Sequence, residues 1–251
     1  MGERRLIFGE APEHYHRHRP GYPSALIDEV VEHAGVGGRV LDVGAGTGKL
    51  TADLLGHGLV VAALEPSPGM AAVLRRTIGP DPAAGVLVVG FEDLPSPSQP
   101  FDVVVAGQSW HWLRPGDRLD VTARVLRPGG RLVLAWNREE HPGSVGDAIV
   151  AAYVAEAPEL AGVDDRPWID LIAAELEADE RFDSVDEREL AWPLTRTTDD
   201  YLAVLATYSG HRLLPPETRT KLFAAVGAAI DADGGEIALD GRTAVITATR
   251  R

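Results

Sequence analysis

The sequence predicts an α/β fold built on a doubly wound, mostly parallel sheet, and three observations carry that prediction. Short apolar segments alternate with segments of helical periodicity between residues 24 and 136. The run over 59–64 is apolar throughout, as expected of a parallel strand that is covered on both faces. The stretch over 39–55 joins an apolar run, a glycine cluster and a helical pattern without a break.

The first half of the chain supplies most of the strand and helix units. Pro20 and Pro23 interrupt the N-terminal segment, and Ser24 stands where the N-cap of the first long helix is expected. Ser67 and Pro68 give the same signal, a cap followed by proline at the first helical position. In order, we expect a helix over 24–35, strands over 39–43, 59–64, 86–89, 101–106 and 131–136, and helices over 49–55, 67–77 and 117–126.

After residue 137 the alternation of strand and helix patterns becomes less regular. The later segments predict helices over 148–157, 168–179, 199–208 and 216–232, and strands over 184–192 and 243–249. The two late strands bring the expected sheet to seven. Because no repeat, low-complexity tract or long linker divides the chain, we expect a single domain over 1–251.

Composition excludes several classes of function. A formal net charge of −14 repels phosphate backbones, so a nucleic-acid partner is not expected. The absence of cysteine rules out disulfides, thiolate metal sites and a cysteine nucleophile. The start lacks the apolar core of a signal peptide, and no apolar run has the length needed to cross a bilayer. We therefore expect a cytoplasmic enzyme with no membrane partner, either a monomer or a homodimer.

The glycine turn after residue 43 is typical of a nucleotide site at the carboxyl end of a strand. Dinucleotide-binding folds use G-x-G-x-x-G, but here Lys49 stands where the third glycine belongs. Glu65 ends the next strand, where a carboxylate can accept hydrogen bonds from the 2′ and 3′ hydroxyls of a ribose. The pattern indicates an adenosine-containing ligand without identifying it.

A series of further motifs accompanies this turn between residues 14 and 137. They are the segment from Tyr15 to Pro23, VLDVGAGTGKL at 40–50, VAALEPSPGM at 61–70, GFEDLP at 90–95, FDVVVAGQSWHW at 101–112 and LRPGGRL at 126–132. The series resembles the class I S-adenosylmethionine-dependent methyltransferases, and QSWHW with Trp136-Asn137-Arg138 resembles their small-molecule branch. The resemblance implies a Rossmann-like methyltransferase fold, S-adenosyl-L-methionine as cofactor and a small organic molecule as methyl acceptor.

The resemblance also implies roles for single residues around the cofactor. Asp42 and the turn from Gly44 to Gly48 would hold the methionine part, with Glu65 on the ribose. Arg19 would pair with the methionine carboxylate, with Tyr15 beside it. In the small-molecule relatives the adenine carboxylate often stands one residue earlier, so either Glu92 or Asp93 would accept from the exocyclic amine. The implied cofactor-binding residues are Tyr15, Arg19, Asp42, Gly44, Ala45, Gly46, Glu65, Pro66, Met70, Phe91, Glu92 and Gln108.

The loop after the strand at 101–106 is the expected place for the chemistry. His111 is the candidate general base, because an unperturbed imidazole titrates near neutrality; alternatively it only packs within the loop. Trp110 and Trp112 either wall the substrate pocket or lie in the core. Asn137 either orients a polar group of the substrate or merely ends its strand. A base is needed only if the acceptor arrives protonated, as an alcohol, phenol or amine does.

Two segments are expected to cover the site. Residues 1–35 form an N-terminal cofactor lid and the first helix, and residues 143–182 form a helical substrate lid inserted after the fifth strand. His14, His16 and His18 alternate, but no metal site is expected because further ligands are missing nearby. Two other functions remain open, a nicotinamide-dependent oxidoreductase and a non-catalytic nucleoside-binding protein with the same fold.

Overall fold

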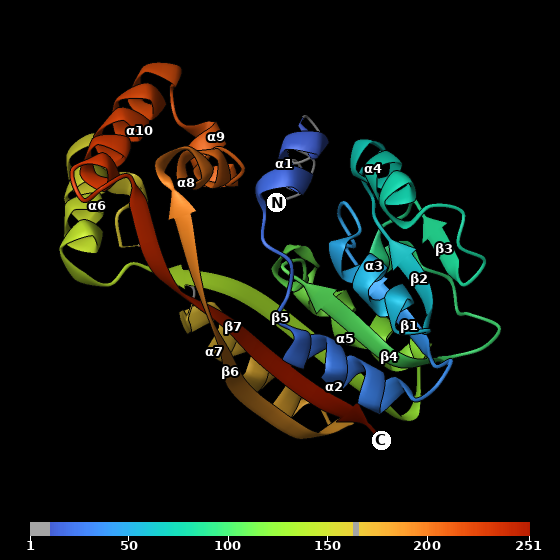
Figure 1. The fold of residues 1–251 in the computed structure, drawn as a ribbon. Helices are drawn as coiled ribbons and strands as arrows, with labels where there is room; N and C mark the ends of the chain where they lie inside the picture. Colours follow the sequence, from blue (N-terminus) through green and yellow to red (C-terminus); the bar gives the residue numbers. More distant parts are fainter. Residues whose placement is uncertain (1–10, 163–165) are drawn as a thin grey trace.

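The computed structural model describes residues 11–162 and 166–251 of the chain (Figure 1). Residues 1–10 of the expected N-terminal lid and residues 163–165 of the expected substrate lid lie outside the described residues. In the described part of the chain, no helix is long and apolar enough to cross a membrane.

A seven-stranded sheet in the order β3-β2-β1-β4-β5-β7-β6 forms the centre of the fold, which confirms the predicted doubly wound architecture. Strands β1 to β5 run parallel, and β7 is antiparallel to both β5 and β6. The strands are β1 (Arg39–Val43), β2 (Val60–Leu64), β3 (Ala84–Leu87), β4 (Phe101–Gly107), β5 (Leu126–Glu140), β6 (Phe182–Thr197) and β7 (Glu236–Arg250).

Helices cover both faces of the sheet. Along β4, Val103 and Val105 face a core shared with α2 and α3, while Val104 and Ala106 face a core shared with α5 and α7. This alternation follows from the two-residue period of a strand. The α-helices are α1 (Pro12–His18), α2 (Ser24–Ala34), α3 (Lys49–Gly56), α4 (Pro68–Ile78), α5 (Pro115–Val125), α6 (Gly143–Glu156), α7 (Arg166–Ala178), α8 (Thr198–Leu205), α9 (Ser209–Leu213) and α10 (Pro216–Asp231), with short 3₁₀ turns at Phe91–Asp93, Trp110–Trp112 and Pro158–Leu160.

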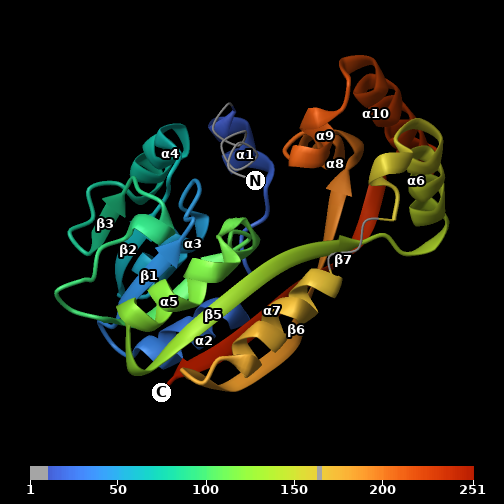
Figure 2. The ribbon, with the colours of Figure 1, turned by 180° about the vertical axis from the view of Figure 1, so that it is seen from behind.

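A cap stands apart from the two sheet cores. Helices α6, α8, α9 and α10 form this cap, and α6, α8 and α10 share a third hydrophobic core with Ile237 and Leu239 of β7. Strands β5, β6 and β7 run from the sheet into the cap, as both views of the ribbon show (Figures 1 and 2). Because β5 ends at the cap, the cap lies beyond the carboxyl edge of the parallel strands.

The segment 143–182 divides between two places. Helix α6 belongs to the cap, whereas α7 packs on the sheet through Ile169, Ile172, Ala173 and Leu176. These four positions recur at helical spacing and form one apolar stripe, which is why the helix buries that face. The cap is completed by α8, α9 and α10, which lie beyond residue 182.

Strand lengths also differ from expectation. Strand β3 begins two residues before 86, because its register pairs Ala84 with Val61 and Leu87 with Leu64. Strands β6 and β7 extend well beyond 184–192 and 243–249, since their mutual pairing continues out to the cap. An antiparallel pair of strands can leave one face in solvent, so the extensions contain polar residues. These polar residues weakened the apolar pattern by which strands are predicted from the sequence.

Candidate functional site

A cavity of about 740 Å³ lies between the carboxyl ends of the parallel strands and the cap. Its floor comes from the residues that follow β1, β2 and β4, and its far wall comes from α6, α8 and α9. A smaller recess of about 50 Å³ shares Tyr15, Arg19 and Gly44 with it and reaches Asp42. The volume is in the range of small-molecule sites in proteins.

The glycine turn allows a very close approach of neighbouring segments. Gly44 has φ +68°, and a Cβ built there would lie 2.5 Å from the Cβ of Ser109. Gly48 has φ +86°, and a Cβ there would lie 2.4 Å from a methyl carbon of Leu74. Any side chain at either position would displace the loop after β4 or helix α4, so the turn requires glycine for both conformation and space.

Glu65 holds the glycine turn in place through hydrogen bonds from backbone N–H groups. Its side chain is buried, with 7% of the residue exposed, and it accepts hydrogen bonds from the N–H of Gly46 at 2.9 Å and of Ser67 at 2.8 Å. Burial raises the pKa of this carboxyl, and the two backbone bonds oppose that shift. Because an ionised carboxylate has about four acceptor positions, it retains capacity for ribose hydroxyls from the cavity.

Asp42 lies at the end of the small recess and is almost fully buried. Thr51 Oγ1 donates to its Oδ2 at 2.6 Å. Burial raises the pKa of Asp42 to about 7, and the neighbouring charge of Glu65 adds to the increase. A buried carboxyl of this kind is stabilised in its ionised form by a cation, so the recess suits a ligand ammonium.

Arg19 joins the N-terminal segment to the cap. Its guanidinium carbon lies 3.9 Å from the ring centroid of Tyr208 and 5.4 Å from that of Tyr15. Its Nε is buried and has no hydrogen-bond partner among the described residues. A stacked cation that lines both cavities and has an unused donor suits an anionic group of a ligand.

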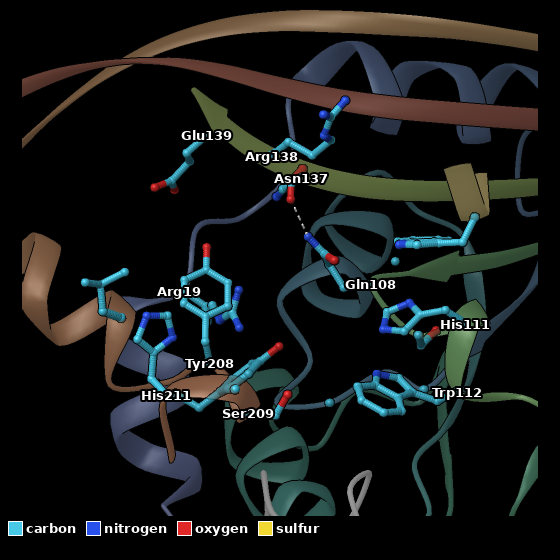
Figure 3. Close-up of a pocket in the computed structure, with 18 of the residues that line it drawn as sticks. Arg19, Gln108, His111, Trp112, Asn137, Arg138, Glu139, Tyr208, Ser209 and His211 are labelled. Carbon is cyan, nitrogen blue, oxygen red and sulfur yellow. Dashed lines mark hydrogen bonds between the residues drawn. The ribbon is translucent and has the colours of Figure 1, made fainter. Parts of the chain in front are cut away.

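An aromatic wall forms one side of the cavity. The ring of His111 lies 4.7 Å from that of Trp112 and 5.0 Å from that of Trp168, measured between centroids. The indole N–H of Trp136 donates to His111 Nδ1 at 3.3 Å, so in the neutral imidazole the proton lies on Nε2. Figure 3 shows His111 and Trp112 on the opposite side of the cavity from Tyr208 and His211.

Trp110 lies in the core and does not line the cavity, which is the second of the two positions that the sequence left open for it. It is 0% exposed, its ring centroid lies 6.3 Å from that of Phe91, and the guanidinium carbon of Arg118 lies 5.6 Å from its ring centroid. The 3₁₀ turn at 110–112 explains the difference, because it directs Trp110 into the sheet core and Trp112 into the cavity.

Asn137 lines the cavity with both of its polar atoms engaged. Its Nδ2 donates to the carbonyl of Gly21 at 2.7 Å, and its Oδ1 accepts from Thr243 at 2.7 Å. Gln108, which adopts a positive φ of 58°, donates from Nε2 to the carbonyl of Asn137 (Figure 3). These bonds tie the N-terminal segment, β5 and the loop after β4 together around the cavity.

The expected adenine region is only partly exposed to the cavity. Pro66, Met70 and Phe91 line it. The side chain of Glu92 is buried, and its carboxylate accepts from the backbone N–H of Arg114 at 3.1 Å. Ala45 lines the smaller recess beside Asp42.

The lining residues that the sequence did not single out are in the cap, in the extension of β5 and at the start of α7, and those between 143 and 182 belong to the segment predicted as the substrate lid. Their sequence signal was weak, because aromatic and histidine residues there follow no recognisable motif. They are Arg138, Glu139, Glu140, His141, Ile149, Tyr153, Leu160, Trp168, Tyr201, Leu205, Tyr208, Ser209 and His211. Among the residues that the structure describes, no three potential metal ligands of the His, Cys, Asp or Glu type come together.

A family model described as a methyltransferase domain matches residues 41–134, which include the glycine turn, Glu65 and the loop after β4.

Comparison with individual proteins also finds methyltransferases. An uncharacterized methyltransferase of Mycobacterium tuberculosis is 37% identical over 217 residues, which cover 86% of this chain and 82% of the relative. An uncharacterized methyltransferase-like protein of Schizosaccharomyces pombe is 27% identical over 84% of this chain and 80% of its own length.

Solved structures show the same fold. A putative type II methyltransferase from Anaeromyxobacter dehalogenans superposes with a TM-score of 0.68 at 24% identity, covering 92% of this chain and 97% of that one. An S-adenosylmethionine-dependent methyltransferase from Thiobacillus denitrificans, in complex with S-adenosyl-L-homocysteine, gives 0.54 at 18% identity, covering 93% of this chain and 94% of that one.

Proposed function

The chain belongs to the class I S-adenosylmethionine-dependent methyltransferases, and on that premise we propose that its methyl acceptor is a small organic molecule. One observation carries the proposal: a single cavity of about 740 Å³ runs from the glycine turn to the cap. That volume must hold a nucleoside cofactor and the reacting part of the acceptor together, which favours a small acceptor. The net charge of −14 supports a small molecule over nucleic acid.

We place the cofactor on the residues whose properties fit its parts. The ammonium of the methionine part goes to the recess at Asp42, and its carboxylate goes to the unused Nε of Arg19. The ribose goes to Glu65. Gly44, Ala45, Gly46 and Gln108 surround the methionine part, Tyr15 closes beside Arg19, and Pro66, Met70 and Phe91, which line the cavity, follow the adenosine.

When bound, S-adenosylmethionine supplies an electrophilic methyl group on its sulfonium sulfur. The chain's part is to orient the acceptor in line with that group and to exclude water. Trp112, Trp168 and His111 supply a flat wall for orientation. Tyr15 of helix α1 and several residues of the cap line the cavity, and we propose that α1 and the cap act as the cofactor lid and the substrate lid.

We propose that His111 positions the acceptor and that it does so by donating from Nε2. In the described geometry its basic Nδ1 accepts from Trp136, so proton abstraction would first require loss of that bond. Asn137 serves mainly to fix the N-terminal segment beside the cavity, since both of its polar atoms bind protein groups.

Label transfer tests the proposal. Purified protein is incubated with methyl-labelled S-adenosylmethionine and a cell extract that has been separated into small-molecule, protein and nucleic-acid fractions. We expect label in the small-molecule fraction, and none there with the Gly44→Val variant, which fills the turn. Label confined to the protein or nucleic-acid fraction would contradict the proposed acceptor class.

A further inference from the structure

Two tyrosine–histidine pairs line the cap end of the cavity. Tyr153 Oη and His211 Nε2 lie 2.6 Å apart, and Tyr201 Oη and His141 Nε2 lie 2.7 Å apart. In each pair the side chains come from segments about 60 residues apart in the sequence, so the cap fold itself brings them together. Figure 3 shows His211 beside Tyr208, across the cavity from His111.

His211 has an unused hydrogen-bonding atom. Only 8% of the residue is exposed, and it lines the cavity. Its Nε2 is bonded to Tyr153, while its Nδ1 is buried with no partner in the described part of the chain. Leaving a buried polar atom unbonded costs free energy, so this atom suits a polar group of a molecule bound in the cavity.

The surroundings hold both pairs in their neutral forms. Burial lowers the pKa of His211 to about 4, with the charge of Arg19 acting in the same direction. Burial also lowers the pKa of His141 and raises the pKa of the Tyr153 and Tyr201 hydroxyls. Desolvation would penalise a charged ligand group at this end in the same way.

The charged residues at this end already have partners. Glu139 forms an ion pair with Arg196, and Glu140 forms one with Arg242. Arg138 pairs with Glu189. A carboxylate or an ammonium of a ligand would therefore displace an existing pair or remain without a counter-ion.

His211 lies close to the expected methionine end of the cofactor. The guanidinium of Arg19 lies 3.9 Å from the ring centroid of Tyr208, and that ring lies 5.7 Å from the ring of His211. With Arg19 on the methionine carboxylate, as proposed above, the His211 pair lies toward the methionine end of the cofactor and not toward its adenine end. The acceptor must bind at that end for its reacting atom to reach the methyl group.

We propose that His211, held in place by Tyr153, recognises the acceptor through Nδ1, and that the acceptor is an uncharged, largely apolar molecule with a hydroxyl group. A hydroxyl both donates and accepts, so it can bond Nδ1 in either tautomer of the ring. Ile149, Leu160 and Leu205 supply apolar walls around it. The inference rests on the proposed function and narrows its acceptor class.

A set of probes that share the naphthalene ring and differ in one substituent tests the inference. Calorimetry at pH 7.5, with the protein saturated in S-adenosylhomocysteine, compares 2-naphthol, naphthalene, 2-naphthoate and 2-naphthylmethylammonium. We expect 2-naphthol to bind about tenfold more tightly than each of the others, the effect of one good hydrogen bond. Tighter binding of either charged probe, or no preference for 2-naphthol, would overturn the inference.

Two variants assign the effect to His211. His211→Phe removes both nitrogens and should abolish the preference for 2-naphthol over naphthalene. His211→Asn keeps a polar atom near the Nδ1 position and should retain the preference within about threefold. Preference retained in the phenylalanine variant would overturn the role of His211. Failure of the unmodified protein to bind S-adenosylhomocysteine would instead refute the cofactor placement, so the two failures are distinguishable.

Discussion

Glu65 is the carboxylate on which the cofactor placement depends most. It is buried beneath the glycine turn and already accepts two backbone hydrogen bonds. Glu65→Ala should weaken binding of S-adenosylhomocysteine by about 1.5–3 kcal/mol, the cost of losing charge-assisted bonds to the ribose. Calorimetry measures the effect, with Glu236→Ala, an exposed carboxylate at the start of β7, as the control. An unchanged dissociation constant would refute the ribose assignment.

The raised pKa of Asp42 predicts how the affinity for the cofactor changes with pH. Its pKa is raised to about 7, and only the ionised form attracts the cofactor ammonium. Affinity for S-adenosylhomocysteine should therefore be full above pH 7 and fall as the pH drops below it, by up to tenfold per unit. Titration from pH 7.5 to 5.5 measures this, and Asp42→Asn should bind more weakly with a flatter profile. A wild-type profile as flat as that of the variant would contradict the ammonium assignment.

The His111→Ala variant distinguishes a positioning role of His111 from a role as general base. Because its Nδ1 accepts from Trp136, we expect His111→Ala to lower kcat/KM by about tenfold, the scale of one lost hydrogen bond, without changing the shape of the pH–rate profile. A loss of 10²-fold or more, together with loss of the acidic limb of the profile, would identify a general base instead. Binding of S-adenosylhomocysteine serves as the control and should be unchanged.

At the scale of single residues, the sequence predicts the position of a residue when a local motif sets the backbone geometry around it. The glycine turn and Glu65 follow directly from the order of strand, turn and helix. The two tryptophans of the loop after β4 could not be separated, because one turn of 3₁₀ helix decides that Trp112 faces the cavity and Trp110 the core. His211 was missed because its partner Tyr153 is 58 residues away and the contact depends on how the cap packs.

Helix α7 shows how an element can be assigned to the wrong place. Its place in a segment inserted after the fifth strand suggested a lid over the substrate, yet its apolar stripe packs on the sheet. A sequence window reports that a helix is amphipathic but does not report which surface it covers. The long extensions of β6 and β7 were missed for a related reason, since their pairing is between distant segments.

This placement of α7 predicts a matched pair of stability effects. Ile169 is fully buried against the sheet core, while Leu171 is 69% exposed on the same helix. Ile169→Ala should lower the free energy of unfolding by about 2–5 kcal/mol through lost burial and a residual cavity. Leu171→Ala should change it by less than about 0.5 kcal/mol. Denaturant unfolding compares the two, and equal effects would contradict the packing of α7 on the sheet.

At the scale of the whole molecule, the sheet and the cap have different tasks. The parallel strands and their glycine turn form the edge on which we place the cofactor, and the long antiparallel strands carry the cap beyond that edge (Figures 1 and 2). The N-terminal segment closes the remaining side, because Arg19 stacks on Tyr208 of the cap and Asn137 holds Gly21. In the proposed arrangement, donor and acceptor therefore share one cavity.

A crystal structure of the protein with S-adenosylhomocysteine bound would test this arrangement most directly. We predict that the ribose hydroxyls bond Glu65, that the carboxylate of the homocysteine part bonds Arg19, and that the sulfur faces the space between His111 and His211. A sulfur directed away from the cap, or a ribose without contact to Glu65, would contradict the account.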